Sequence, residues 1–215
     1  MSLMLYMLRH GETTFSLTRG FCGALDVDLT EYGHQMAQAF ANEYKSLKWE
    51  AIYCSPMKRA RDTATPLSEA VGLPLQIREG IRECNYGDWE GKSKDEVRDQ
   101  FPDDYVDWMT EPAWNSPSNG ETAVSVRNRA MSVIAEIEKN HPDGNVLLVA
   151  HRTTLRIVLC SLLGIDLGRY RDRMEYPAAS LSVVSFEKYG PLLERMGDRA
   201  YMTKDLRGRE GYAAP

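Results

Sequence analysis

The chain has 215 residues, 43% hydrophobic and 27% charged, an ordinary globular composition long enough for a sizeable core. Its formal net charge is −5 without a long run of either sign, which argues against nucleic acid or an anionic membrane as partner. The four cysteines show neither zinc-site nor disulfide-framework spacing, so we expect a cytoplasmic protein without metal or cofactor.

Apolar runs and helical patterns alternate in the first half of the chain. The apolar runs predict strands buried on both faces, and the first of them is too short to span a membrane. Apolar side chains three or four residues apart predict helices, the first behind a favourable N-cap at Thr30 and the second kinked at Pro66. In chain order we expect a strand at 3–8, a helix over 31–46, a strand at 51–54 and a helix over 57–71.

A long excursion and a second series of elements follow. Residues 92–119 mix short helical segments with three prolines, so we expect an inserted lid or cap. Within it, Trp108 and Trp114 either pack the excursion onto the body or line a substrate pocket. The tail 203–215 is expected to be loosely held. Between lid and tail, in chain order, we predict a helix over 121–139, a strand at 146–150, a helix over 153–163 before Gly164, and strands at 181–186 and 192–196.

This alternation is typical of a layered α/β fold. We predict one domain over residues 1–215, with a doubly wound, mostly parallel open sheet, helices on both faces and the lid-like insertion at about 92–119. In such sheets ligands bind beyond the carboxyl ends of the parallel strands. The residues directly after each strand are therefore the candidate site.

Histidines and arginines follow three of the predicted strands. Arg9 and His10 end the first strand, Arg59 lies in the first turn of the helix after the second, and His151-Arg152 follows the strand at 146–150. Because these strand ends share one rim, we expect the side chains to converge there.

Five segments, in order, resemble the histidine phosphatase superfamily (phosphoglycerate mutase-like), phosphatase branch. Arg9-His10-Gly11 is similar to the RHG signature of that family, and His151 with Arg156 is similar to its second histidine block. The other three similar segments are 23–33, 55–64 and 82–91.

The resemblance implies a phosphatase acting on a small phosphorylated metabolite. The expected catalytic residues are His10, Glu83 and His151. Phosphate binding is expected from Arg9, Arg59, His151 and Arg152, and substrate contacts from Ser16, Cys22 and Gly23. The family also suggests that the Gly11 carbonyl holds one ring nitrogen of His10. A homodimer is compatible with the sequence.

The chemistry can be argued from the residues as well. A phosphomonoester dianion needs positive charge, which Arg9, Arg59 and a protonated His151 can supply. The same cations disfavour protonation of His10 and keep it nucleophilic, so attack on phosphorus gives a phosphohistidine. Glu83 is the candidate proton donor to the leaving group and then the base for water.

Three positions depart from the family pattern: Ser16, Ala150 and Arg152, where Asn, Ser and Gly are frequent. A cation such as Arg152 at a helix N-terminus is disfavoured by the helix dipole. We therefore expect a compensating anion, either a neighbouring Asp or Glu or a second anionic group of the substrate.

Two other functions compete with the phosphatase. A phosphoglycerate mutase primed by a bisphosphate is favoured by Phe21-Cys22-Gly23, which resembles the mutase loop, whereas residues 86–91 resemble the phosphatase branch. A pseudoenzyme that binds phosphorylated partners would have lost one of the five central residues, and all are present: Arg9, His10, Arg59, Glu83 and His151. Phosphoserine, phosphoglycerate-like acids and the nucleotide-loop phosphate of cobalamin synthesis are the candidate substrates by resemblance.

Overall fold

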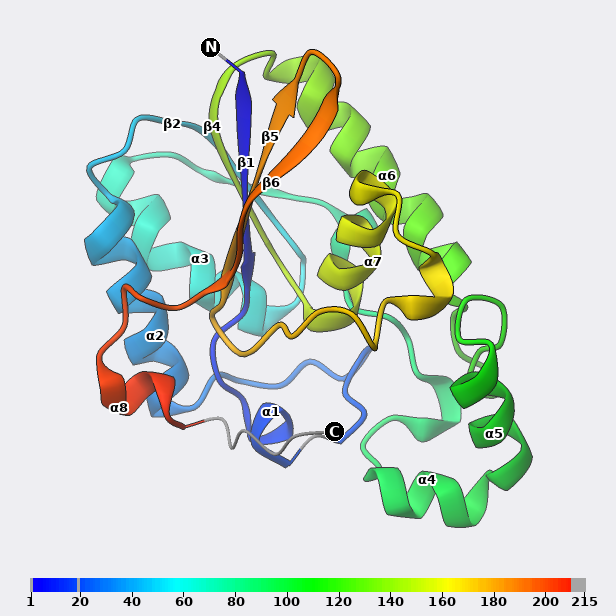
Figure 1. The fold of residues 1–215 in the computed structure, drawn as a ribbon. Coiled ribbons are helices and arrows are strands. Elements are labelled where there is room, and N and C mark those ends of the chain that lie inside the picture. The colour runs from blue at the N-terminus through cyan, green and yellow to red at the C-terminus, as the bar shows by residue number, and fades with distance from the viewer. Residues whose placement is uncertain (1, 19, 210–215) are drawn as a thin grey trace.

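Six strands form a single sheet in the order β3-β2-β4-β1-β5-β6 in the computed structural model, which describes residues 2–18 and 20–209 (Figure 1). Strands β1 to β4 are parallel, β5 is antiparallel to β1, and β6 is antiparallel to β5. The predicted mostly parallel open sheet is therefore confirmed. The strands are β1 (Leu3–Arg9), β2 (Trp49–Cys54), β3 (Leu75–Ile77), β4 (Gly144–Ala150), β5 (Leu181–Glu187) and β6 (Gly190–Asp198).

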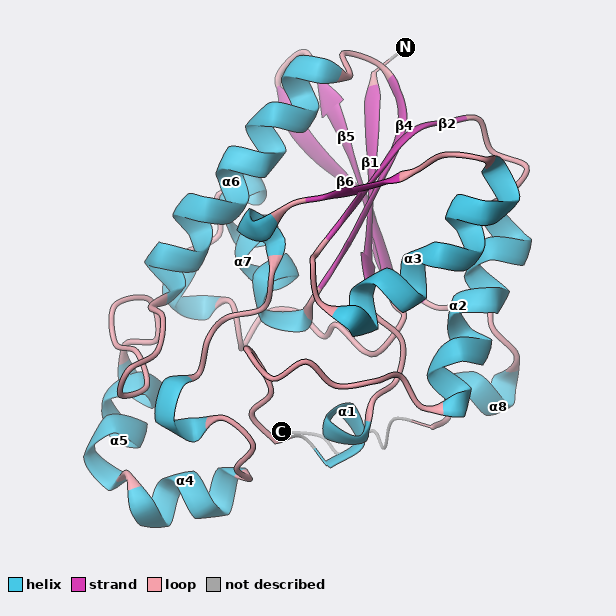
Figure 2. Ribbon diagram, turned by 180° about the vertical axis from the view of Figure 1, so that it is seen from behind, coloured by secondary structure: helices cyan, strands magenta, loops and turns pink. Residues whose placement is uncertain are grey.

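Helices cover both faces of this sheet, as predicted. Figure 2 shows α2 (Glu31–Tyr44) and α3 (Lys58–Val71) on one side and α6 (Ala123–Asn140) and α7 (Arg152–Leu163) on the other. The Thr30 hydroxyl accepts a hydrogen bond from Gly33 N at 3.1 Å and caps α2, while Gly164 ends α7 with φ of 67°.

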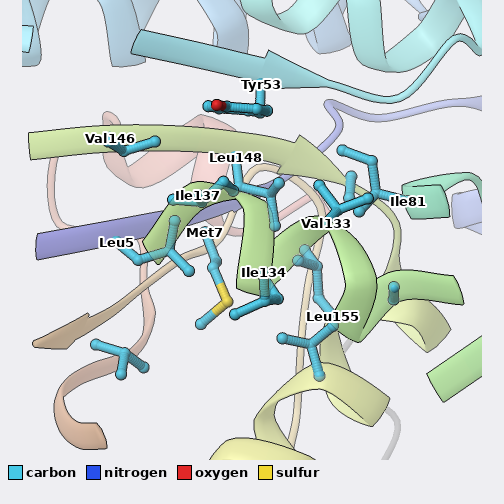
Figure 3. Packing of buried hydrophobic residues seen from close by; sticks show 14 of the residues in the cluster. Leu5, Met7, Tyr53, Ile81, Val133, Ile134, Ile137, Val146, Leu148 and Leu155 are labelled. Atoms are coloured by element: carbon cyan, nitrogen blue, oxygen red, sulfur yellow. The ribbon is translucent and has the colours of Figure 1, made fainter. Parts of the chain in front are cut away.

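The strands bury alternate side chains on the two faces because successive residues point to opposite sides. Leu5 and Met7 of β1 pack with Val146 and Leu148 of β4 against α6 and α7, where Ile134 is among the contacting residues (Figure 3). On the opposite face Leu8, Ile52 and Leu147 are fully buried in the cluster under α2 and α3. Both hydrophobic clusters hold the sheet, and hence its carboxyl rim, in place.

The expected insertion contains two helices, α4 (Lys94–Gln100) and α5 (Pro102–Thr110), which lie beyond the carboxyl end of β1 (Figure 1). Phe21, Trp89, Val97 and Trp108 form the cluster that attaches it to the body. Of the two tryptophans, Trp108 both packs in this cluster and lines the cavity that contains His10, whereas Trp114 is 69% exposed.

Three local features differ from the expectations. Strand β3 and the short helix α1 (Thr14–Thr18) were not anticipated, since three to five residues carry too little periodicity to predict an element. Residues 203–209 are not loose: helix α8 (Lys204–Arg207) is capped by Thr203 and buries Leu206 beside Met36. The rest of the expected loose tail, 210–215, lies outside the described residues. No helix of the described chain is long and apolar enough to cross a membrane.

Candidate active site

The register of the two central strands brings the two predicted catalytic histidines together. Arg9, the last residue of β1, lies opposite Ala150, the last residue of β4. His10 and His151 therefore leave the sheet side by side, and their ring centroids are 5.2 Å apart. Both rings are buried.

His10 is held as a neutral imidazole with its Nε2 lone pair available. Its Nδ1 lies 2.8 Å from the Gly11 carbonyl oxygen, and because a carbonyl only accepts, Nδ1 carries the proton. Burial and the cations Arg59 and Arg9 hold the pKa of His10 well below its ordinary value. The expected Gly11 contact is present, and the ring is in the protonation state that a nucleophile needs.

His151 is also neutral in this structure, so the expectation that it carries positive charge is wrong here. Arg59 Nε donates to its Nδ1 at 3.2 Å, which leaves the proton on Nε2, 2.7 Å from Ser55 Oγ. Burial, followed by the nearby Arg59, holds the pKa of His151 well below its ordinary value. Arginines must therefore supply the positive charge of the free site.

The two central arginines are anchored by main-chain carbonyls. Arg59, 1% exposed, donates to Leu25 O at 2.7 Å and to Gly23 O at 3.0 Å. Arg9 donates from Nη1 to Tyr176 O at 2.7 Å. Such fixed guanidinium groups can meet phosphoryl oxygens without first losing conformational freedom.

Glu83 lies at the N-terminus of α7, and its two oxygens are engaged unequally. Oε1 accepts from Cys84 N at 2.9 Å and from Thr154 N at 3.1 Å, and it also lies 3.1 Å from the Thr154 hydroxyl. Among the described residues, Oε2 accepts from Thr153 N alone, at 3.1 Å. The carboxyl is thus fixed by backbone N–H groups of a helix start, while Oε2 keeps room for a proton.

One cavity of about 280 Å³ joins these groups. The predicted site residues that line it are Arg9, His10, Ser16, Cys22, Arg59, Glu83 and Arg152. His151 lies behind His10 and Arg59 rather than in the lining. Burial raises the pKa of the Cys22 thiol to about 11, so this side chain is uncharged. The Ser16 hydroxyl is engaged with the backbone of Thr13.

Gly23 is placed differently from the expectation, because it supports the site without lining the cavity in the described structure. Its N–H donates to the Glu90 carboxylate at 2.9 Å, and its carbonyl accepts from Arg59. A Cβ at this position would lie 1.8 Å from Cys84 O. Glycine is therefore required here by a close backbone approach, not by a substrate contact.

The cavity also contains residues to which the sequence pattern assigned no role: Lys94, Arg156, Arg171 and Glu175. Glu175 Oε2 lies 3.4 Å from Arg152 and 3.6 Å from Arg156, so it is the neighbouring anion expected near Arg152. Only Arg156 had a signal in the sequence, because it belongs to the second histidine block and lies four residues after Arg152, on the same helix face. Arg171 and Glu175 belong to an irregular segment with no pattern.

Among the described residues, no group of three or more His, Cys, Asp or Glu side chains could hold a metal ion.

A family model described as the histidine phosphatase superfamily (branch 1) matches residues 5–199. Phosphoserine phosphatase 1 of Hydrogenobacter thermophilus is 33% identical over 184 residues, 86% of this chain and 87% of that protein. The 2,3-bisphosphoglycerate-dependent phosphoglycerate mutase of Bartonella tribocorum is 32% identical over 77% of this chain and 84% of that protein. A solved mycobacterial glucosyl-3-phosphoglycerate phosphatase is similar with a TM-score of 0.83 and 27% identity, covering 91% of this chain and 99% of that one.

Proposed function

The chain belongs to the histidine phosphatase superfamily, and we propose from this that it hydrolyses a small phosphomonoester metabolite without a metal ion, through a phosphohistidine on His10. The observation that carries the proposal is the neutral His10 ring. Its Nδ1 proton is bound by Gly11 O, and its Nε2 lone pair belongs to a side chain that lines a cavity with Arg9 and Arg59.

In the first step, Nε2 of His10 attacks phosphorus and the bond from phosphorus to the ester oxygen breaks. A proton on Glu83 Oε2 moves to that oxygen, so the product leaves as an alcohol. Arg9 and Arg59 stabilise the charge on the transferring phosphoryl group.

In the second step, water attacks the phosphohistidine, and the nitrogen–phosphorus bond breaks. Glu83 takes one proton from the water, inorganic phosphate leaves, and His10 returns to its neutral form. The hydrogen bond between His151 and Arg59 positions the guanidinium during both steps.

The test is to trap the intermediate. Wild-type protein mixed with a radiolabelled phosphomonoester and quenched in alkali should carry acid-labile phosphate on His10, and His10→Ala should carry none. Phosphate on an Asp, Ser or Cys side chain would contradict the proposal. Turnover of an aryl phosphate should persist in EDTA, and loss of activity that a divalent ion restores would contradict the metal-free mechanism.

A phosphoglycerate mutase is the second candidate, supported by the similarity to the Bartonella mutase and by Phe21 and Cys22 in the cavity wall. The two functions differ in whether water reaches the phosphohistidine. Negligible phosphate release from 3-phosphoglycerate, together with isomerisation started by a trace of bisphosphate, would favour the mutase.

The proposed compartment is the cytoplasm, supported by the four free cysteines Cys22, Cys54, Cys84 and Cys160.

A further inference from the structure

Arg152 and Arg156 form a close pair of like charges at the start of α7. They are four residues apart, so they share one helix face, where like charges repel. Arg156 is only 6% exposed, and burial together with Arg152 lowers its pKa to about 10. Both side chains line the cavity that contains His10.

The Glu175 carboxylate partly neutralises the positive charge of this pair, and its contacts with both guanidinium groups are long. Its Oε2 lies 3.4 Å from Arg152 Nη2 and 3.6 Å from Arg156 Nη2, longer than the 2.7–2.9 Å typical of charge-assisted hydrogen bonds. The Glu175 side chain is 69% exposed. An exposed contact of this kind contributes little stability and costs little to break.

The guanidinium groups retain unused hydrogen-bonding capacity. The Nε atoms of Arg152, Arg156 and Arg171 are buried and have no acceptor within the described part of the chain. All three residues line the same cavity. Buried donors without a partner are uncommon in proteins, and three of them here belong to residues of one cavity wall.

The charge of the cavity also exceeds what a phosphate needs. Its described lining contains six cationic side chains and two acidic ones, an excess of four positive charges: Arg9, Arg59, Lys94, Arg152, Arg156 and Arg171 against Glu83 and Glu175. A phosphate dianion neutralises two of these, so a second anionic group on the substrate is favoured.

We propose that Arg152 and Arg156 bind a carboxylate of the substrate, and that Glu175 occupies their shared face in the free protein until the substrate carboxylate displaces it. A carboxylate is favoured over a second phosphate because the pair already accommodates one, and the planar guanidinium fork matches its geometry. The inference rests on the proposed phosphatase function and narrows its substrates to phosphomonoesters of small acids. Glu175 is then an internal competitor of the substrate.

Two pairs of compounds that differ in a carboxylate test this: phosphoserine against phosphoethanolamine, and 3-phosphoglycerate against glycerol 3-phosphate. Wild-type kcat/KM should be higher for the carboxylate member of each pair. Glu175→Gln should raise this preference by roughly twofold to fivefold, the range expected when a weak exposed ion pair is removed. The matched control is Asp172→Asn, which removes an acid of the same segment that pairs with Arg169 and lies outside the cavity lining. It should not change the preference.

Arg152→Gln should act in the opposite direction and reduce the preference by about tenfold, because a charged hydrogen bond is lost only for the carboxylate member. Equal kcat/KM within both pairs, or a preference that Glu175→Gln lowers or leaves unchanged, would overturn the subsite while leaving the phosphatase intact.

Binding measured by calorimetry on His10→Ala separates the subsite from turnover. That variant should still bind phosphoserine more tightly than phosphoethanolamine, and adding Glu175→Gln should widen the difference. If wild type hydrolyses no phosphomonoester and this binding difference persists, the result contradicts the proposed phosphatase function and supports the carboxylate subsite. Equal dissociation constants would overturn the subsite.

Discussion

Among single residues, Glu83 has two carboxyl oxygens that accept different numbers of hydrogen bonds, and this predicts how the rate depends on the leaving group. Glu83→Gln removes the proton that Oε2 would deliver, keeps an oxygen that accepts from Thr154 N, and loses the acceptor of Thr153 N. An alkoxide needs that proton, whereas a phenolate leaves without it. We expect kcat for an alkyl phosphate to fall by about 100-fold or more, and for an aryl phosphate by much less. Single-turnover rates with both esters test this, and equal losses would mean that Glu83 is not the acid.

The lowered pKa of His10 predicts how the reaction rate depends on pH. Because burial, Arg59 and Arg9 lower its pKa well below the ordinary 6.5, His10 stays neutral and nucleophilic in mildly acidic solution. The acidic limb of kcat/KM for the free enzyme should therefore have its midpoint below pH 6.5. An aryl phosphate is suitable for the measurement once its own ionisation has been measured and corrected for. A midpoint at or above the ordinary histidine value would contradict this assignment.

At the scale of elements, the end of the described chain is tied to the loop that carries His10. Arg209, beyond α8, donates to both oxygens of the fully buried Glu12 carboxylate at 2.9 Å and 3.2 Å, and Thr30 donates to Glu12 at 2.6 Å. Glu12 lies two residues after His10, so this ion pair braces the loop behind the proposed nucleophile.

Arg209→Ala should consequently lower kcat more than it changes KM. Unpairing the buried Glu12 lets the loop shift, and a displacement of a reacting group by about 1 Å can cost on the order of 100-fold in rate. The neighbouring Arg207 is exposed and serves as the matched control in Arg207→Ala. Partial recovery of kcat on adding guanidinium, or in Arg209→Lys, would separate positioning from a general loss of folding. Unchanged kcat in a folded Arg209→Ala protein would show that the ion pair does not position His10.

At the scale of the whole molecule, two buried neutral histidines couple stability to pH. In the unfolded chain His10 and His151 take up protons as pH falls through their ordinary pKa of 6.5, whereas in the folded protein both stay neutral to lower pH. The unfolded state then binds more protons. The free energy of unfolding is thus fully retained above pH 6.5 and falls below it, by up to about 1.4 kcal/mol per pH unit for each ring, until the folded pKa is reached.

Urea unfolding between pH 7 and pH 5.5 measures this dependence. The range is chosen above the ordinary carboxyl pKa of about 4.3, so that carboxyl groups with that pKa stay mostly ionised throughout. His10→Gln removes one of the two groups and should reduce the slope by roughly half. The same slope in wild type and His10→Gln would contradict the assignment of the effect to the site.

The long elements and the meeting of His10 with His151 could be predicted from the sequence because their signals are local. Thr30 and Gly164 mark helix ends through hydrogen bonds and backbone angles formed within a few residues. Apolar runs predicted β1, β2 and β4, and placing His10 and His151 at their ends required only the rule that parallel strands share a carboxyl edge.

Other properties were decided by tertiary structure, because they depend on contacts between segments that the chain brings together only when folded. The neutral state of His151 follows from its burial and from Arg59, 92 residues away, and the need for glycine at position 23 follows from the approach of Cys84. Arg171 and Glu175 line the cavity from an irregular segment, where no periodicity or helix cap predicts which way a side chain points. Composition, periodicity and motifs were enough to predict the fold class, the family resemblance and the central residues. Only the packed chain decided which charges meet in the cavity, because electrostatic interactions depend on distance and burial in space rather than on separation along the chain.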